Sequence, residues 1–496
     1  MKKISFYIIL SLCLTQISCQ EDFLKTTDPT RIGRDLFYQN QTQFEQALNG
    51  VYGQLQTITN SAYIQQEMMS DNTTFDFNPL DRGGAAGWEA FEYSTVNQGN
   101  GEIGALWNNH YSTMYNINYA LEKLAASKID ATAKGVLEGE FKFIRAYHYF
   151  NLVRYFGDVV LATKTLTNPN EAFDLVRSPQ AEVYKQILSD LADASKLLPA
   201  KPALKGRASQ GAALSLLGKV YLTQKNYAAA ATTLKQVTAL GYALNANYKD
   251  NFDPAKKNGV ESIFEVQYQE GANGFQGSFM YNFMPRPMTS GELFTLAGTS
   301  NPQPQTGEGN NAPMPELINS YEEGDLRKAA SIGYITCSST LWQAKTYPYI
   351  KKFVRTHALN GNHGMNWPIF RYSEVLLFLA EALNEQGKTA EAAPFMNQVR
   401  KRAGLAETTA STQAAFRTAL MNERRWELAF ENKRWHDLVR TDTFKERITA
   451  KGKAITADPF AHYYEKGYTL RSNSFTVIEK YYPLPADEAA LNPNIK

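Results

Sequence analysis

Residues 371–384 of this chain read RYSEVLLFLAEALN, and large apolar residues recur in this stretch at steps of three and four. The residues with this spacing are Leu376, Leu379, Ala380 and Leu383, of which Ala380 is small. Such a stretch predicts an amphipathic helix, because these steps place the apolar side chains on one face. The small residue lets a second helix approach closely.

The second helix of the pair follows directly in the sequence. Gly387-Lys388 forms the turn between the two helices. In the second helix, Ala392 is the small residue and Met396 the large residue of the same pattern. An earlier segment has the same spacing at Leu214, Leu217, Gly218, Tyr221, Ala230 and Leu234. Both segments reproduce the tetratricopeptide pattern W-x2-L-G-x2-Y…A-x3-F, with leucine in place of the tryptophan in the earlier one. A long insertion separates the two copies, so they predict a helical scaffold rather than a regular solenoid.

Other segments extend the helical frame. Helical periodicity covers residues 44–55, 107–124, 143–156 and 183–198. Strand signals are few: residues 262–268 alternate with period two, and residues 476–482 carry a weaker signal. The predicted fold is mainly α, with tetratricopeptide-like helix pairs forming a right-handed helical scaffold, long irregular loop insertions and a few short strands.

Two segments rich in aromatic residues interrupt this frame. Residues 71–104 combine glycine, proline and asparagine with several rings, which predicts a long loop. Residues 271–368 are similarly irregular, so we expect one domain over 34–496, with a scaffold at about 34–270 and 369–445 and a ligand-side insertion at about 271–368. A rigid helical frame that carries aromatic loops is typical of a binding site.

The N-terminus has the features of a signal peptide. Lys2 and Lys3 precede an apolar stretch that ends near Ser18-Cys19 and is too short and too interrupted to span a bilayer. A small residue directly before such a cysteine is typical of a bacterial lipoprotein cleavage site. The predictions are a lipoprotein signal peptide over 1–18, lipid attachment at Cys19 and a lipidated tether over 19–33. Gln16 stands where an aliphatic residue is usual, so secretion with cleavage nearby is the alternative.

The balance of charged residues limits the kinds of ligand that the chain is expected to bind. Without Lys2 and Lys3 the chain has 49 Lys and Arg against 49 Asp and Glu, and it has no basic run. Nucleic-acid binding is therefore not expected, and the ligand is predicted to be neutral or lightly charged.

The cysteines are not expected to form a disulfide. Cys13 leaves with the signal peptide and Cys19 takes lipid, so no intrachain disulfide can form. The remaining cysteine, Cys337, is predicted to be a small core residue rather than a catalytic thiol.

An enzyme is not expected. Glu423, Glu427 and Glu431 are spaced four residues apart and would share a helix face, and paired carboxylates could serve glycoside hydrolysis. Arginines lie close to them in the sequence, at Arg424, Arg425, Arg434 and Arg440. We predict that these arginines keep the carboxylates ionised in a salt-bridge network that stabilises the fold.

No metal or cofactor is predicted. The six His have no zinc-type spacing, and the sequence has no glycine-rich phosphate loop. Oxygen ligands for Ca²⁺ are present at Asp71, Asp76, Asn78 and Asp81. These residues lack the EF-hand order, so a solvated turn is the preferred interpretation.

The C-terminal third resembles the SusD/RagB family of Bacteroidetes outer-membrane lipoproteins. The resemblance rests on residues 371–384, 397–405 and 423–440 and on Tyr482-Pro483-Leu484-Pro485, and it extends upstream to Arg145-Ala146, Phe156-Gly157-Asp158 and Cys19. It implies a tetratricopeptide-like helical fold and a lipid anchor in the outer leaflet. It also implies a lid-like role over a SusC-like TonB-dependent transporter that imports captured oligosaccharides.

A neutral glycan is the predicted ligand. Sugar rings expose C–H patches that stack on flat aromatic faces, while polar side chains bind the hydroxyls. The candidate binding residues are Trp88, Tyr93, Tyr281, Trp342, Asp71 and Arg82. The predicted function is capture of glycans at the cell surface and their delivery to the SusC-like transporter. The alternative is a scaffold that binds a peptide or protein partner without sugar binding.

Overall fold

The computed structural model describes residues 37–495 except 76–81, 167, 272, 285–289, 298–308, 337–344 and 359–361. The α-helices are α2 (Gln41–Gln66), α3 (Arg82–Glu92), α4 (Gly101–Ala126), α5 (Ala131–Phe156), α6 (Gln180–Leu197), α7 (Gln210–Thr223), α8 (Tyr227–Thr238), α9 (Ser290–Ala297), α10 (Pro315–Ser320), α11 (Leu326–Ser331), α12 (Tyr372–Asn384), α13 (Thr389–Arg402), α14 (Gln413–Glu427), α15 (Arg434–Arg440), α16 (Phe444–Ala457) and α17 (Ala486–Leu491). The short 3-10 helices are η3 (Pro169–Asp174), η4 (Tyr248–Phe252), η5 (Pro254–Lys256), η6 (Phe279–Phe283), η8 (Lys351–Phe353), η9 (Phe460–His462) and η10 (Pro493–Ile495).

The strands are short and form antiparallel pairs. The pairs are β1 (Thr73–Thr74) with β5 (Ala312–Pro313), β2 (Val159–Val160) with β3 (Arg177–Ser178), β4 (Ser262–Val266) with β8 (Trp367–Arg371), and β6 (Ile332–Thr336) with β7 (Thr346–Ile350). The prediction of a mainly helical fold with few short strands is therefore confirmed. The alternating segment at 262–268 forms β4 as expected, whereas residues 476–482 form no strand.

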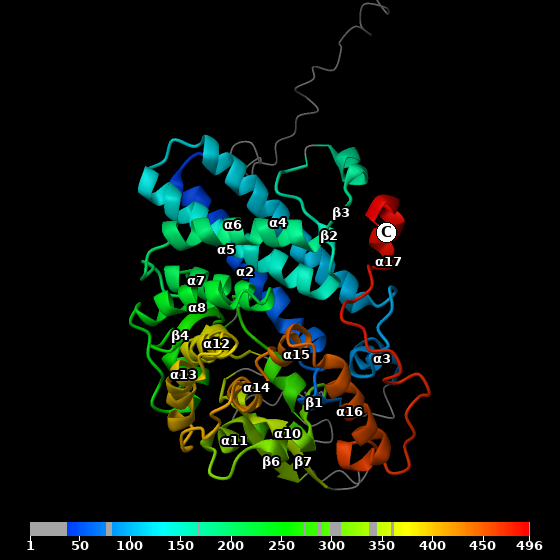
Figure 1. Ribbon diagram of the computed structural model, residues 1–496. Helices are drawn as coiled ribbons and strands as arrows, with labels where there is room; N and C mark the ends of the chain where they lie inside the picture. Colours follow the sequence, from blue (N-terminus) through cyan, green and yellow to red (C-terminus); the bar gives the residue numbers. More distant parts are fainter. Residues whose placement is uncertain are drawn as a thin grey trace, which may run out of the picture.

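The two predicted helix pairs are α7 with α8 and α12 with α13, and they stack directly on each other because α8 packs against α12. The chain between them leaves the stack and returns to it, as Figure 1 shows. The small residue of the repeat pattern has the expected role. A Cβ atom on Gly218 of α7 would fall 2.5 Å from Leu234 Cδ2 of α8, so only glycine allows this approach. Helices α2, α4, α5 and α6 continue the stack on the other side of α7.

The aromatic-rich segments contain more regular structure than the sequence suggests. The prediction of one long loop over 71–104 is wrong, because this segment contains β1, α3 and the start of α4. Helix α3 is held by burial of one face, where Glu89, Phe91 and Glu92 are each at most 2% exposed. The insertion 271–368 likewise contains several short elements, among them the β6–β7 hairpin.

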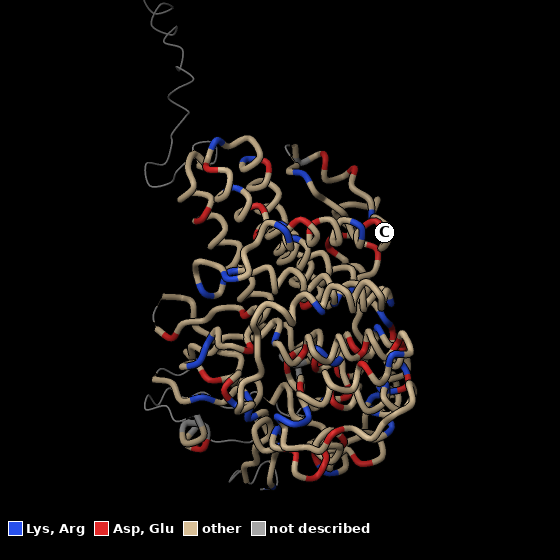
Figure 2. The backbone as a smooth tube through the Cα atoms, turned by 60° about the vertical axis from the view of Figure 1, so that its left-hand side comes forward, with Lys and Arg blue, Asp and Glu red and all other residues tan. Residues whose placement is uncertain are grey.

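Acidic and basic residues form a buried network in the half of the molecule that contains α12, α13 and α14. Figure 2 shows Lys and Arg positions interleaved with Asp and Glu positions through this half. Arg371, at the end of β8, is 2% exposed. Its guanidinium lies 2.7 Å from Glu261 Oε1, 2.8 Å from Glu427 Oε1 and 2.8 Å from Glu431 Oε1.

The predicted salt bridges of Glu423 and Glu427 are confirmed, but their predicted partners are wrong. Glu423 pairs with Arg327 and Arg400, and Glu427 pairs with Arg327, Arg371 and Arg402. The neighbouring arginines point elsewhere because residues next to Glu on a helix lie on other faces. The pairs they form instead are Arg424 and Arg440 with Asp437, and Arg425 and Arg434 with Asp71.

Glu431 does not share the helix face of Glu423 and Glu427, because α14 ends at Glu427. Beyond that end, Phe430 and Asn432 have positive φ angles, and the chain turns so that Glu431 meets Arg371 and Lys352. Burial alone would raise the pKa of Glu427, but the charges of Arg402, Arg371 and Arg327 outweigh it and hold this pKa below its usual value. The carboxylate is therefore ionised and serves the fold.

We expect Arg371→Ala to lower the free energy of unfolding by about 3–5 kcal/mol, because it leaves buried carboxylates without their shared partner. The matched control is Arg417→Ala. Arg417 also pairs with a glutamate, Glu385, but it is 45% exposed, so its loss should cost at most about 1 kcal/mol. Urea unfolding followed by circular dichroism measures both, and equal effects of the two changes would contradict the assigned role of Arg371.

Candidate functional site

Asp71, predicted to bind ligand, is buried in an ion pair. It is 7% exposed, and Arg434 donates from Nε to its Oδ1 at 2.7 Å and from Nη2 to its Oδ2 at 2.9 Å. Burial would raise the pKa of this carboxyl, but Arg434 and Arg425 hold the pKa below its usual value. Both oxygens of Asp71 thus accept a hydrogen bond from Arg434, and the binding of ligand hydroxyls by Asp71 stays a prediction.

Tyr93 and Tyr281 are also buried, so neither ring is an open stacking platform. Tyr93 is 3% exposed and makes an edge contact with Phe475 at 5.8 Å between ring centroids. Tyr281 is 1% exposed, and its hydroxyl is hydrogen-bonded to Nε2 of His357. The sequence signal was misleading because a loop ring that packs on the core has the same composition as one that faces solvent.

Trp88 is only partly buried. It lies on α3, and its Nε1 donates to Glu102 Oε1 of α4 at 2.7 Å. The indole packs against the core and is half-buried. Its role as a ligand-binding residue thus remains a prediction.

The other predicted positions lie outside the described part. Arg82 is the first residue of α3, but its side chain is not described. Residues outside the described ranges are Cys19, Cys337, Trp342, Asp76, Asn78 and Asp81. Among the described residues, no group of His, Cys, Asp or Glu is arranged to hold a metal ion, and no helix has the length and apolar character needed to cross a membrane.

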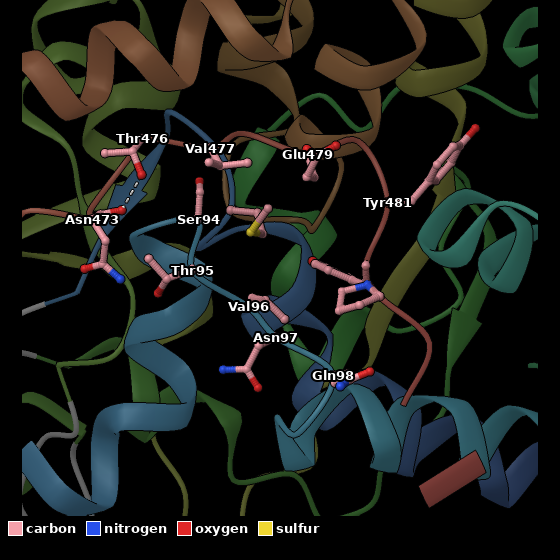
Figure 3. A pocket seen from close by; sticks show the side chains of 13 residues that line it. Ser94, Thr95, Val96, Asn97, Gln98, Asn473, Thr476, Val477, Glu479 and Tyr481 are labelled. Atoms are coloured by element: carbon pink, nitrogen blue, oxygen red, sulfur yellow. Dashed lines mark hydrogen bonds between the residues drawn. The ribbon is translucent and has the colours of Figure 1, made fainter. Parts of the chain in front are cut away.

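A cavity of about 740 Å³ is lined by the residues that follow α3, and its mixed apolar and polar lining makes it a candidate ligand site. We call it the open cleft. Its walls are residues 94–98, which follow α3, and residues 473–483, which follow α16; Met69 adds to its lining. Figure 3 shows side chains of both segments around the same space.

Backbone hydrogen bonds join the two walls at their ends. Phe475 donates its N–H to the Tyr93 carbonyl at 2.8 Å, and Ala486 donates to the Gln98 carbonyl at 2.8 Å. Between these points the two segments separate. Tyr482 fixes the second wall to the helical stack, because its hydroxyl donates to the Gln65 carbonyl of α2 at 2.6 Å. The cleft is therefore part of the folded frame.

The lining suits a neutral amphipathic ligand. The apolar and aromatic side chains are Met69, Val96, Val477, Tyr481, Tyr482 and Pro483, and the polar ones are Ser94, Thr95, Asn97, Gln98, Asn473, Thr476 and Glu479. Amides and hydroxyls can both donate and accept hydrogen bonds. The single carboxylate, Glu479, and the absence of Lys and Arg from this lining of described residues argue against a strongly charged ligand in the cleft.

These cleft residues were missed by the sequence analysis. They are small and polar, they lie in two segments far apart in the chain, and the segment 476–482 resembled a strand. Only the region near residue 94 carried a signal, because the aromatic-rich segment 71–104 pointed to it.

The fold and the cleft define a class of protein: a tetratricopeptide-like helical scaffold that holds a ligand-sized cleft formed by irregular segments. Comparison with known proteins gives the family. The model of the SusD family matches residues 334–496, and a SusD-like family described as starch-binding and associating with the outer membrane matches residues 22–222. The chain therefore belongs to the SusD/RagB family, as the sequence motifs predicted.

Relatives resemble the chain over most of its length. A SusD-like protein of Formosa agariphila is 26% identical over 88% of this chain and 90% of its own. A solved laminarin-binding SusD-like protein is 27% identical with a TM-score of 0.73, covering 92% of this chain and 99% of that one. A SusD homologue of Bacteroides thetaiotaomicron shares the fold with a TM-score of 0.78 at 22% identity, covering 95% of this chain and 99% of that one.

The ion pair of Asp71 predicts a pH-dependent stability. Because folding lowers the pKa of Asp71, its ionised form stabilises the fold above the unfolded pKa of about 3.9, and this contribution is lost as pH falls below that value. We expect Asp71→Asn to cost about 3 kcal/mol in free energy of unfolding at pH 7. The difference from the unaltered chain should shrink at pH 3 in urea unfolding, and a constant difference would contradict this.

Proposed function

We propose that the chain is a glycan-binding protein of the cell surface and that the open cleft holds a neutral part of an oligosaccharide. The observation that carries the proposal is the lining of the cleft, where apolar side chains such as Val96 and Val477 alternate with amides and hydroxyls. A sugar presents the same combination of C–H patches and hydroxyls. Trp88, on the helix that leads into residues 94–98, is half-buried and adds an aromatic ring near the cleft.

The relatives support this proposal. One relative is a laminarin-binding SusD-like protein that covers 92% of this chain, and laminarin is a polysaccharide. The SusD-like family that matches residues 22–222 is described as starch-binding. A non-enzymatic role agrees with both names. It also agrees with the structure, because the carboxylates that could have served hydrolysis, Glu423 and Glu427, are buried in ion pairs.

We further propose a lipid anchor at Cys19 in the outer membrane and delivery of the captured glycan to a SusC-like TonB-dependent transporter. The family description of association with the outer membrane supports the location. The signal-peptide pattern before Cys19 supports the anchor. Loss of membrane association in a Cys19→Ala protein expressed in a Bacteroidetes host, measured by cell fractionation, would support lipidation.

The alternative is a scaffold that binds a peptide or protein. Stacked tetratricopeptide-like pairs support it, since such pairs form extended surfaces in other proteins. The two candidates differ in their ligands. Calorimetry with a glycan panel and with peptides therefore separates them.

For the glycan proposal, we expect calorimetry on the chain from Gln20 onward to detect binding of neutral oligosaccharides, with β-glucan and starch fragments in the panel. Gln98→Ala combined with Asn473→Ala should weaken binding about tenfold or more, because two hydrogen bonds of about 1 kcal/mol each are removed. Gln398→Ala is the matched control: Gln398 is an exposed amide of α13, outside the cleft lining. Equal affinities of the two variants would place the site elsewhere, and no glycan binding at all would favour the scaffold.

A further inference from the structure

A second pocket lies beside the open cleft, and its chemistry is different. It has a volume of about 310 Å³ and is lined by α5, α6, the α7–α8 turn, α15 and residues 480–481. We call it the basic pocket, after Arg154, Lys225, His436 and Lys480 in its lining. Tyr481 lines both the basic pocket and the open cleft, so the two are neighbours.

Arg154 has no carboxylate partner among the described residues. Its Nε donates to the Phe150 carbonyl at 2.9 Å, its Nη2 donates to Asn151 Oδ1, and its guanidinium stacks over the Phe150 ring at 4.0 Å. Arg154 is half-buried, and more deeply buried arginines of the chain differ from it, since Arg145 pairs with Asp190 and Arg424 with Asp437. Burial lowers the pKa of Arg154, because the guanidinium loses contact with water and no carboxylate ion pair offsets that cost. A half-buried charge without a carboxylate partner is stabilised by a counter-ion.

His436 is a buried polar group of the same pocket without a hydrogen-bond partner among the described residues. It is 6% exposed, and neither ring nitrogen has a hydrogen-bond partner among the described residues. A neutral imidazole still carries one N–H donor, and a buried donor that is left unsatisfied costs about 1–3 kcal/mol. A ligand that accepts this hydrogen bond would remove that cost.

The rim of the basic pocket adds positive charge. Lys225 and Lys480 are exposed, and neither forms an ion pair among the described residues. Arg440 also lines the pocket, but Glu381 and Asp437 already bind it. Asp442 is the single carboxylate of the lining. The pocket therefore carries more positive than negative charge, although the chain is close to neutral.

We infer that the basic pocket binds an oxyanion group, a sulfate ester or a carboxylate, carried by the glycan whose neutral part lies in the open cleft. Arg154 and His436 donate to its oxygens from inside, and Lys225 and Lys480 contribute charge at the rim. The volume is enough for a tetrahedral anion and several waters, since a water takes about 30 Å³. The inference rests on the proposed glycan binding and specifies further that the bound glycan carries a negatively charged group.

Tyr481 supplies the connection between the two sites. Its hydroxyl donates to Gln180 Oε1 of the basic pocket at 2.8 Å. Figure 3 shows its ring pointing away from the labelled side chains of the open cleft. A sugar chain that passes Tyr481 can thus place a neutral unit on one side and a charged substituent on the other.

The first test uses simple anions on the chain from Gln20 onward, which contains every described residue. Calorimetry with sodium sulfate, phosphate or acetate at constant ionic strength should detect millimolar binding. Lys225→Gln combined with Lys480→Gln should weaken it about tenfold, because both side chains are exposed and their change leaves the fold intact. Arg154→Gln should abolish it. The control is Lys185→Gln, an exposed lysine of α6 outside the pocket, which should bind as the unaltered chain does.

The second test compares a sulfated oligosaccharide with its desulfated form. We expect the sulfated form to bind at least about tenfold more tightly, and Lys225→Gln with Lys480→Gln to remove only this difference. Binding of inorganic anions without any preference for the sulfated glycan would overturn the link to the cleft. Absence of anion binding would overturn the inference altogether. The proposed function is tested separately, by whether the chain binds neutral glycans.

Discussion

The contact between the Arg371 guanidinium and its buried carboxylates is the interaction on which the rest of the structure depends. Arg371 ends β8, Glu261 precedes β4, and Glu427 ends α14. One side chain therefore fixes the point where the insertion leaves the helical stack, the point where it returns, and the end of a later helix. Apolar contacts could stabilise these elements, but the directed hydrogen bonds from Arg371 Nη1 to Glu261 and Glu427 also fix their relative positions.

The same kind of interaction positions the open cleft. Lys451 of α16 is buried, and its Nζ donates to the carbonyls of Met68 and Ser70 at 3.0 and 2.9 Å and to Glu92 Oε2 at 2.8 Å. Met69 lines the cleft, and Glu92 ends the helix that leads into residues 94–98. A single ammonium group thus holds two parts of the lining together. A preorganised site of this kind loses less entropy when ligand binds.

The sequence predicted what local spacing determines. The helix pair at Leu214 and the pair at Leu376 follow from steps of three and four, and Gly218 shows the close approach that the pattern implies. Partner choice was not predictable, because Glu427 meets arginines that are near it only in the folded chain. The burial of two candidate rings, Tyr93 and Tyr281, was not predictable for a related reason: composition does not tell whether a ring faces solvent or the core. Most of the cleft residues were not recognised as a site, since amides and hydroxyls at 94–98 and 473–483 are ordinary loop residues.

Net charge says little about the local charge of a pocket. The balance of Lys and Arg against Asp and Glu predicts a neutral ligand, but it counts buried and exposed groups alike. Much of the acidic content lies in the buried network, where each carboxylate serves an internal arginine or lysine. Arg154 is left outside that network, next to His436. The chain as a whole is therefore close to neutral while this pocket has an excess of positive charge, because the Asp and Glu residues that balance the total pair with other Lys and Arg residues.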